Sequence, residues 1–311
     1  FQEAMADSQP DIICIAAPDE LHFSLLKEVS STDVSLVFVE KPLTATREEA
    51  MEIKEIYKKR NKPVLVNFKR GFVPEINDLI DRVRNKEFGE LRFSSGYYNR
   101  GFKHNASHLL HLFIKMTQCK DFEVKSNMGY VCDYTDTDPS FSLLLSAKNA
   151  GLLLLKSFDA SVYPIFEMDM HFENARLRIV NTGDTLEIHK KRKSRIFQDY
   201  EFIQNADTYS TSMHRSLYFS AENIYNVLQG QAKLMVPLDE GVEVVEDVEG
   251  LYHVSGHANK PDLKEFHKII NPEILIPMHG EYRHLREHAK IAKESGIKAL
   301  IVTNGDVAEI I

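Results

Sequence analysis

The sequence predicts an α/β fold followed by α+β structure: a partial Rossmann-like parallel sheet, an open and mostly antiparallel sheet, and a small C-terminal α/β segment. Over residues 1–99, continuous apolar runs alternate with helix-like segments, as in a parallel sheet buried on both faces. Residues 122–190 alternate apolar and polar side chains between turn signals, which is typical of an antiparallel sheet with one solvated face. We therefore expect three parts, namely residues 1–99, 100–248 and 249–311.

Composition and charge exclude several classes of protein. With 311 residues, 43% of them hydrophobic, the chain can bury a large core. No apolar run approaches the roughly 18 residues that span a bilayer, and residues 1–4 lack the features of a secretory signal. A net charge of −8 disfavours a general nucleic-acid surface, and the basic run 190–193 is expected to be a solvated hairpin. Because the chain begins with Phe1 shortly before its first strand, we expect it to be part of a longer protein.

Cysteine usage indicates a reducing compartment. The three cysteines, Cys14, Cys119 and Cys132, show neither CxxC nor metal-type spacing. Free thiols are then the simplest interpretation, and they predict a cytoplasmic protein. No membrane partner is expected, because the sequence has no apolar run long enough to span a bilayer.

The first part is predicted to be half of a doubly wound domain. Strands are expected at 11–17, 34–39 and 63–68. Helices are expected at about 19–29, 46–60 and 74–84, with Thr46 and Glu49 capping the second of them. Alternation of this kind predicts right-handed crossovers between parallel strands.

The segment Val39-Glu40-Lys41-Pro42-Leu43 ends the second predicted strand. It places the Lys41 ammonium group at the carboxyl edge of the sheet, where open α/β sheets bind ligands. Pro42 restricts the backbone of Lys41 to extended geometry, so the direction of that side chain is constrained. Lys41 is therefore a candidate proton carrier, while a solvated lysine at a strand-to-helix turn remains the alternative.

Three stretches resemble, in residues, order and spacing, the later half of the nucleotide-binding domain of the Gfo/Idh/MocA oxidoreductases: Ala16-Ala17-Pro18-Asp19-Glu20-Leu21-His22, Glu40-Lys41-Pro42-Leu43 and Asn67-Phe68-Lys69-Arg70-Gly71-Phe72-Val73-Pro74. The resemblance implies an enzyme that uses NAD or NADP and acts on a sugar, a sugar nucleotide or a cyclitol. It implies that Lys41 orients the substrate hydroxyl and helps to move its proton. The residues that it places along the cofactor are Ala17, Pro18, His22, Glu40, Lys41 and Pro42.

The phosphate-binding elements of such a domain do not occur in this sequence. A GxGxxG turn after the first strand, with an acidic residue about twenty positions later, would bind the pyrophosphate and the ribose. Gly89, Gly96 and Gly101 come too late in the chain to form that turn. The sequence therefore predicts no pyrophosphate-binding helix within these 311 residues.

A histidine-rich segment opens the second part. Residues 100–116 predict an amphipathic helix in which His104, His108 and His111 share one face. Such a row could bind a transition metal, or it could supply general acid/base groups to a substrate pocket. We favour the acid/base interpretation because no carboxylate pattern completes a metal site, and we expect His111 to be a structural residue in leucine-rich packing.

The same segment is similar to a second signature of the Gfo/Idh/MocA family, in which an acidic residue precedes the catalytic histidine by four positions. The resemblance implies that His108 is the catalytic histidine and that His104 occupies the usual Asp position. It also implies substrate contacts from Lys103, His104 and Asn105, as in members that act on nucleotide-linked sugars. His111 replaces the Asp that is common at the end of the motif.

The family resemblance implies that the antiparallel sheet of the second part binds substrate and often forms the dimer interface. This sheet offers a packing surface, so we expect a homo-oligomer, and a non-catalytic dimerisation scaffold is one alternative function. Apolar spacing predicts a helix at residues 212–228. This helix resembles the late helix of the family that returns to the first domain, which makes His214 and Tyr218 weak site candidates.

Three stretches of the last part resemble the end of a ribonuclease J type metallo-β-lactamase with a β-CASP insert: Leu251 to Ala258, Ile274 to Arg283 and Asn304 to Val307. The resemblance implies that Ser255 and His257 contact an RNA phosphate and that His279 binds zinc. The HxHxDH ligand cluster that two-metal hydrolysis needs is absent from the sequence. The chain is thus expected to join two incomplete modules near residues 240–250, and a metal-dependent RNA hydrolase remnant is the second alternative function.

Overall fold

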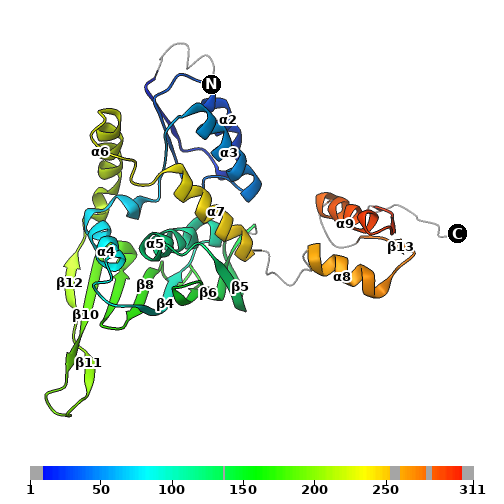
Figure 1. Ribbon diagram of the computed structural model, residues 1–311. Helices are drawn as coiled ribbons and strands as arrows, with labels where there is room; N and C mark the ends of the chain where they lie inside the picture. Colours follow the sequence, from blue (N-terminus) through cyan, green and yellow to red (C-terminus); the bar gives the residue numbers. More distant parts are fainter. Residues whose placement is uncertain (1–9, 136, 253–259, 278–281, 303–311) are drawn as a thin grey trace. The chain divides into compact units, whose positions relative to one another are not determined.

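The computed structural model describes residues 10–135, 137–252, 260–277 and 282–302. Contacts divide the chain into two compact units, Phe1–Tyr252 and His253–Ile311 (Figure 1). Within the described residues, no helix is both long enough and apolar enough to cross a membrane.

The first sheet of unit 1 is parallel and has the strand order β1-β2-β3. Its strands are β1 (Ile12–Ile15), β2 (Leu36–Val39) and β3 (Val64–Val66). Their side chains are apolar and mostly β-branched, and Val37, Val39 and Val66 are completely buried. Burial of this kind is what a parallel sheet with two covered faces requires. The predicted partial parallel sheet is confirmed.

Two of the helices that follow these strands begin within one residue of the predicted start, whereas the first begins at His22, after a 3-10 turn at Asp19–Leu21. The helices are α2 (His22–Ser30), α3 (Arg47–Arg60) and α4 (Pro74–Arg84). The Thr46 side chain accepts from the backbone of Glu49, and the Glu49 carboxylate accepts from the backbone of Thr46, which closes the predicted capping box. The hydroxyl of Tyr57 donates to the carbonyl of Leu26 at 2.8 Å and joins α3 to α2.

The second sheet has the order β11-β10-β9-β8-β4-β7-β6-β5, and β12 also pairs with β10. Its strands are β4 (Leu91–Tyr98), β5 (Phe122–Thr135), β6 (Asp138–Ala147), β7 (Gly151–Ser157), β8 (Phe166–Phe172), β9 (Ala175–Val180), β10 (Thr185–Lys193), β11 (Glu201–Ile203) and β12 (Asp207–Ser210). The β4–β7 pair is parallel and the other pairs are antiparallel. This confirms the predicted open, mostly antiparallel sheet, and the exposed run Lys190–Lys193 does lie in a hairpin.

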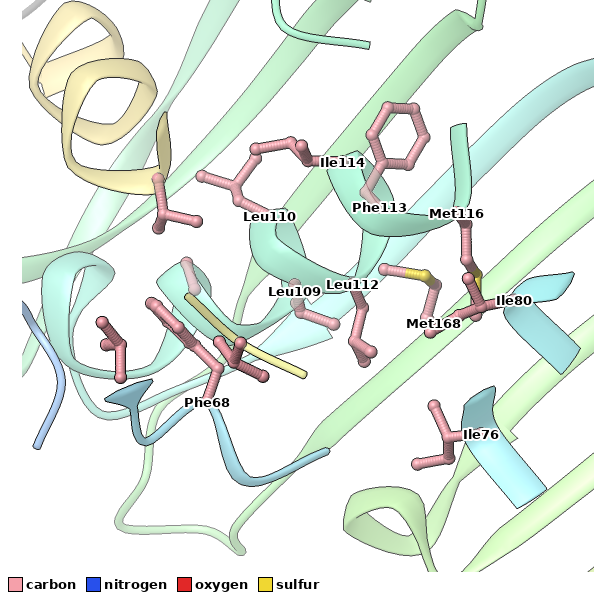
Figure 2. Close-up of a cluster of buried hydrophobic side chains, with 14 of the residues drawn as sticks. Phe68, Ile76, Ile80, Leu109, Leu110, Leu112, Phe113, Ile114, Met116 and Met168 are labelled. Atoms are coloured by element: carbon pink, nitrogen blue, oxygen red, sulfur yellow. The ribbon is translucent and has the colours of Figure 1, made fainter. Parts of the chain in front are cut away.

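One face of this sheet packs against α5 (Ser107–Thr117) and α4. Figure 2 shows Leu112 and Met116 of α5 beside Met168 of β8, with Ile76 and Ile80 of α4 facing them. All five side chains belong to the main hydrophobic core of unit 1. The core therefore lies between the sheet and these two helices, and it holds α5 against the sheet.

The last helix of unit 1, α7 (Leu238–Tyr252), ties the first sheet to α5. Gly241 lies so close to β3 that a Cβ atom there would come within 2.9 Å of the Val66 side chain. Glu240 accepts hydrogen bonds from Lys115 at 2.8 Å and pairs with His111 at 2.9 Å. Another helix, α6 (Ser216–Leu228), packs against the segment that follows β3.

Unit 2 is a small α/β unit. It contains α8 (Lys260–Ile270), β13 (Ile274–Leu275), α9 (Tyr282–Glu294) and β14 (Lys298–Ala299), with β13 and β14 parallel. The Nε2 atoms of His267 and His288 lie 3.1 Å apart and join α8 to α9. The predicted C-terminal α/β segment is confirmed.

Candidate functional site

Lys41 lies directly after β2, at the carboxyl edge of the parallel sheet. Its Nζ atom donates to the backbone carbonyl of His104 at 2.7 Å and lies 3.0 Å from Nδ1 of the same residue. The side chain is half-buried, as is that of His104. An amine from the first sheet and an imidazole from the second part of unit 1 therefore meet at one point.

Both pKa values are lowered, but the pKa of Lys41 stays above that of His104, so the shared proton resides on Lys41. Burial lowers the pKa of Lys41 to about 8, although the carboxylates of Asp19, Glu40 and Asp138 oppose that change. Burial, and then the charge of Lys41, lower the pKa of His104 to about 4. At neutral pH, His104 is thus neutral and its Nδ1 can accept from the Lys41 ammonium. A lysine with a pKa near 8 can give or take a proton close to physiological pH.

A carboxylate from a distant strand positions His104. Asp138 of β6 is buried, and it accepts the backbone N–H groups of Lys103 at 2.8 Å and His104 at 2.9 Å. Gly101 precedes them with a φ of +84°, and a Cβ atom there would lie 2.2 Å from Oδ2 of Asp138. Only glycine suits both this backbone conformation and this close approach. On its other side the His104 ring stacks on Tyr134, with ring centroids 4.5 Å apart.

The predicted common face for His104, His108 and His111 does not form. Residues Phe102–Ala106 are a π-helix, with the N–H of Ala106 donating to the carbonyl of Gly101, and α5 begins only at Ser107. The turn that carries His104 therefore departs from α-helical spacing, and the His104 ring contacts Tyr134 and not Phe68. The ring of His108 meets Phe68 edge-on at 5.4 Å, and the ring of His111 stacks on Phe68 at 4.4 Å.

His108 lies behind the Lys41–His104 contact in an aromatic pocket. Its ring is buried between Phe68 and Phe166, and Nδ1 has no hydrogen-bond partner among the described residues. Burial, and then the charge of Arg70, hold its pKa well below the usual value, so the ring is neutral. The guanidinium of Arg70 lies 3.3 Å from the centre of the Phe166 ring, and its Nε donates to the carbonyl of Thr182 at 3.0 Å.

His111 has the structural environment that we expected, with a charged partner as well. It is buried, its Nε2 lies 2.9 Å from a carboxylate oxygen of Glu240, and Lys115 donates to the same carboxylate. These contacts hold α5 against α7.

The residues expected along a cofactor line the carboxyl ends of β1 and β2. The ring nitrogens of His22 lie 2.7 Å from the carbonyl of Pro42 and 2.9 Å from the carbonyl of Ala17, so this buried ring joins the two loops. Glu40 accepts from the side-chain amide of Asn67 at 2.6 Å. Pro18 is exposed beside them. This edge is open to a ligand, and the buried His22 ring holds together the two loops that form it.

The other predicted site residues lie outside the contact between Lys41 and His104. Lys103 donates to the carbonyl of Ala45 at 3.3 Å, and the Asn105 amide donates to the carbonyl of Asn99 at 2.8 Å, so both connect backbone segments around the site. The weak candidates His214 and Tyr218 are exposed near the start of α6. The predicted phosphate and metal residues, Ser255, His257 and His279, lie outside the described residues. Across the described part of the chain, no three His, Cys, Asp or Glu side chains lie close enough to hold a metal ion.

No pattern in the sequence indicates two of the residues that surround His104. Asp138 and Tyr134 belong to neighbouring strands of a β-hairpin that carries no recognisable motif. Arg70 falls inside the Asn67 to Pro74 stretch, but its burial beside His108 follows from packing that the motif does not specify.

Two family models match this chain, one at each end. Residues 1–68 match the oxidoreductase family with an NAD-binding Rossmann fold, Gfo/Idh/MocA. Residues 241–302 match the RNA specificity domain of Zn-dependent metallo-hydrolases. The predicted resemblance to both families is confirmed.

The curated relatives match only a short part of the chain. Ribonuclease J of Sinorhizobium meliloti is 35% identical over 74 residues, which are 24% of this chain and 13% of that protein. Ribonuclease J of Pyrococcus abyssi is 34% identical over 115 residues, which are 35% of this chain and 25% of that protein. This chain therefore spans a quarter or less of the length of these relatives.

Solved structures share the fold of most of the chain. A UDP-N-acetylglucosamine 3-dehydrogenase from Acidithiobacillus ferrooxidans aligns with a TM-score of 0.61 and 17% identity over 80% of each chain. An inositol dehydrogenase homologue from Azotobacter vinelandii, solved with NADH and myo-inositol, aligns with a TM-score of 0.60 and 17% identity over 80% of this chain and 76% of that one. At such identity these structures show the fold alone.

Proposed function

We propose that this chain supplies the catalytic and substrate-contacting part of a nicotinamide-dependent dehydrogenase that acts on an alcohol group of a sugar, a sugar nucleotide or a cyclitol. The observation that supports this most directly is the contact between Lys41 and His104 at the carboxyl edge of the parallel sheet. Such edges bind ligands in open α/β sheets, and a lysine with a pKa of about 8 suits proton transfer. The match of residues 1–68 to an NAD-binding oxidoreductase family agrees with it.

In this proposal Lys41 handles the proton of the reacting hydroxyl. Its amine form takes that proton when the alcohol is oxidised, and its ammonium form returns the proton when the carbonyl is reduced. His104 accepts a hydrogen bond from Lys41 and thereby fixes the direction of Nζ. The bound nicotinamide would accept or return the hydride of the carbinol carbon.

The residues of this chain fit the reactive end of such a cofactor. The loops after β1 and β2 are joined by His22 and expose the edge that carries Pro18 and Lys41. No GxGxxG occurs in the sequence, so the proposal also requires a segment that binds the pyrophosphate. The residues at this edge do not distinguish NAD from NADP.

The test measures cofactor binding and turnover separately. Calorimetry with NADH and NADPH measures cofactor binding by the purified chain, which should be weak because the chain has no GxGxxG turn, and no binding of either cofactor would overturn cofactor-dependent catalysis by this chain alone. Turnover is followed as NADH absorbance with a panel of polyols. His104→Asn should lower kcat by about 10²-fold, whereas His108→Phe, which keeps an aromatic ring between Phe68 and Phe166, should lower it less than tenfold. The reverse ranking would assign the imidazole role to His108, as the family resemblance implies.

A second candidate function is supported by the match of residues 241–302 to an RNA specificity domain. We propose that this segment contacts RNA through Ser255 and His257, with His279 as a zinc ligand, and that it does not hydrolyse RNA by itself. Two-metal hydrolysis needs a cluster of ligands, and the described residues contain no such cluster. The test purifies the chain free of metal, adds zinc, and measures both the bound zinc and the electrophoretic shift of a labelled RNA. No bound zinc together with no RNA shift would eliminate this function.

We further propose that the uncovered face of the second sheet joins two copies of the chain. Helices α4 and α5 cover one face (Figure 1). On the other face the cross-strand pairs Phe93–Leu152 and Leu144–Leu154 are only partly buried within one chain. Light scattering should show a dimer, and Leu152→Arg should yield a folded monomer. If the wild-type chain is itself a monomer, this interface is wrong, and the non-catalytic dimerisation scaffold is excluded as well.

A further inference from the structure

A hollow of about 500 Å³ lies beside the Lys41–His104 contact. It is lined by Arg100, Cys132, Asp133, Tyr134, Thr135, Asp159, Ala160 and Ser161. Tyr134 belongs both to this wall and to the site, because its ring stacks on His104. Tyr134 therefore connects the hollow to the site.

We propose that this hollow is a subsite for the part of the substrate remote from the reacting carbon, and that it takes a neutral polyhydroxylated ring, either a cyclitol or an unphosphorylated sugar. The inference rests on the proposed function, because Lys41 marks the position of the reacting carbon. It predicts that the part of the substrate remote from the reacting carbon is a ring without a phosphate group.

The lining offers the groups that a polyhydroxylated ring needs. Tyr134 is 48% exposed, so its ring presents an apolar face against which the C–H groups of a sugar can pack. The carboxylates of Asp133 and Asp159 accept hydrogen bonds, while the guanidinium of Arg100 donates them and the hydroxyl of Ser161 can do both. Ring hydroxyls both donate and accept, so a lining of mixed polarity can satisfy them.

The two acidic side chains are held in place before any ligand binds. Asp133 accepts the backbone N–H of Arg100 at 2.7 Å and the hydroxyl of Ser140 at 2.6 Å. Asp159 accepts the backbone N–H of Ser161 at 2.8 Å, and this hydrogen bond lowers the pKa of the Asp159 carboxyl, so it is ionised at neutral pH. Each carboxylate oxygen can accept a second hydrogen bond.

A buried amide fixes the two walls relative to each other. Asn99 is 1% exposed, and it donates to the carbonyl of Tyr163 at 2.7 Å and accepts from the N–H of Ile165 at 3.2 Å. Arg100 of the first wall follows Asn99 directly, while Asp159 and Ser161 of the second wall lie in the loop that Asn99 holds. The hollow thus depends on rigid contacts within unit 1.

The charge of the lining selects against anionic ligands. Two carboxylates face the hollow against one guanidinium, so a phosphate or diphosphate placed there would meet net negative charge. A neutral ring has no such penalty and gains hydrogen bonds to charged acceptors. The hollow therefore favours a ligand of the myo-inositol type over one of the UDP-sugar type.

The test measures binding of sugars to the whole chain without any nicotinamide, by saturation-transfer NMR and calorimetry. The probes are myo-inositol and glucose as neutral rings, with glucose 6-phosphate and UDP-N-acetylglucosamine as anionic ones. We expect the neutral rings to bind more tightly. Asp159→Asn should weaken their binding about tenfold and reduce the preference over glucose 6-phosphate. Asp121→Asn, in an exposed ion pair with Lys148, is the matched control and should change neither quantity.

Aromatic variants test the stacking wall. Tyr134→Phe should retain the binding of neutral rings, and Tyr134→Leu should weaken it severalfold. Tighter binding of the anionic probes, or neutral binding that Asp159→Asn and Tyr134→Leu leave unchanged, would overturn the subsite. Binding that depends on Asp159 in a chain that shows no turnover with NAD or NADP would support the subsite while removing the proposed dehydrogenase function, so the two failures are distinguishable.

Discussion

Lys41 should destabilise the folded chain at neutral pH, so Lys41→Met should be more stable than the wild type. Burial lowers the pKa of Lys41 from 10.5 to about 8. That difference corresponds to roughly 3 kcal/mol of unfavourable free energy for the ammonium form. The substitution keeps the buried aliphatic chain but leaves the His104 carbonyl without its donor, which costs about 1–2 kcal/mol. We therefore expect a net gain of about 1–2 kcal/mol in the free energy of unfolding at pH 7.

The pH dependence of that gain identifies its cause. Between pH 8 and 10.5 the unfolded wild type binds more protons at Lys41 than the folded wild type does, so its stability rises with pH. The methionine variant lacks this contribution, and its advantage should shrink across this window and disappear near pH 10. Urea unfolding of unit 1, followed by circular dichroism at pH 7 and at pH 10, measures both differences. A variant less stable than the wild type at pH 7, or an advantage independent of pH, would refute the assignment of a desolvated ammonium at this position.

Two further substitutions test the contacts that support the site. Gly101→Ala should lower the free energy of unfolding by about 2–4 kcal/mol and reduce turnover, because its Cβ would collide with Asp138. The control is Gly129→Ala, at a similar positive φ but with open space around it. It should lower the free energy of unfolding by only about 1 kcal/mol in the same urea titration. Lys115→Met should cost about 2–3 kcal/mol by leaving the Glu240 carboxylate without its cation. Burial alone would raise the pKa of Glu240, but His111 and Lys115 together lower it, so its stabilising contribution is present above pH 4.5 and is lost as the pH falls through the lower, folded-state value. The difference between wild type and Lys115→Met should therefore narrow below pH 4.5.

Local patterns were sufficient to predict the first sheet and the position of Lys41. Strand β2 is a run of apolar side chains buried on both faces, and the following Glu40, Lys41 and Pro42 stand where the chain leaves the sheet. Both features depend on neighbouring residues along the chain, namely on alternation of strands with helices and on the carboxyl end of one strand. The capping box at Thr46 and Glu49 was predictable for the same reason.

The imidazole that contacts Lys41 could not be identified from spacing. An α-helical period places His104 and His108 on one face, but the turn before α5 is a π-helix. Its backbone N–H groups are held by Asp138, which lies 34 residues after His104 in a strand without a motif. The conformation that turns His104 toward Lys41 is therefore set by a contact between distant parts of the sequence. Helical periodicity carries no information about such a contact.

Helix α7 contains the start of the segment that matches the RNA specificity domain, yet it packs as part of unit 1. The match to the RNA specificity domain begins at residue 241, yet Gly241 packs against Val66 of β3. Val242 and Val244 are buried in the same core, and the preceding Glu240 pairs with Lys115 of α5. These residues bury apolar side chains and pair with a cation of α5, so the first turns of the helix belong to the core of unit 1. The packing of unit 1 therefore constrains the first residues of the segment that matches the RNA specificity domain.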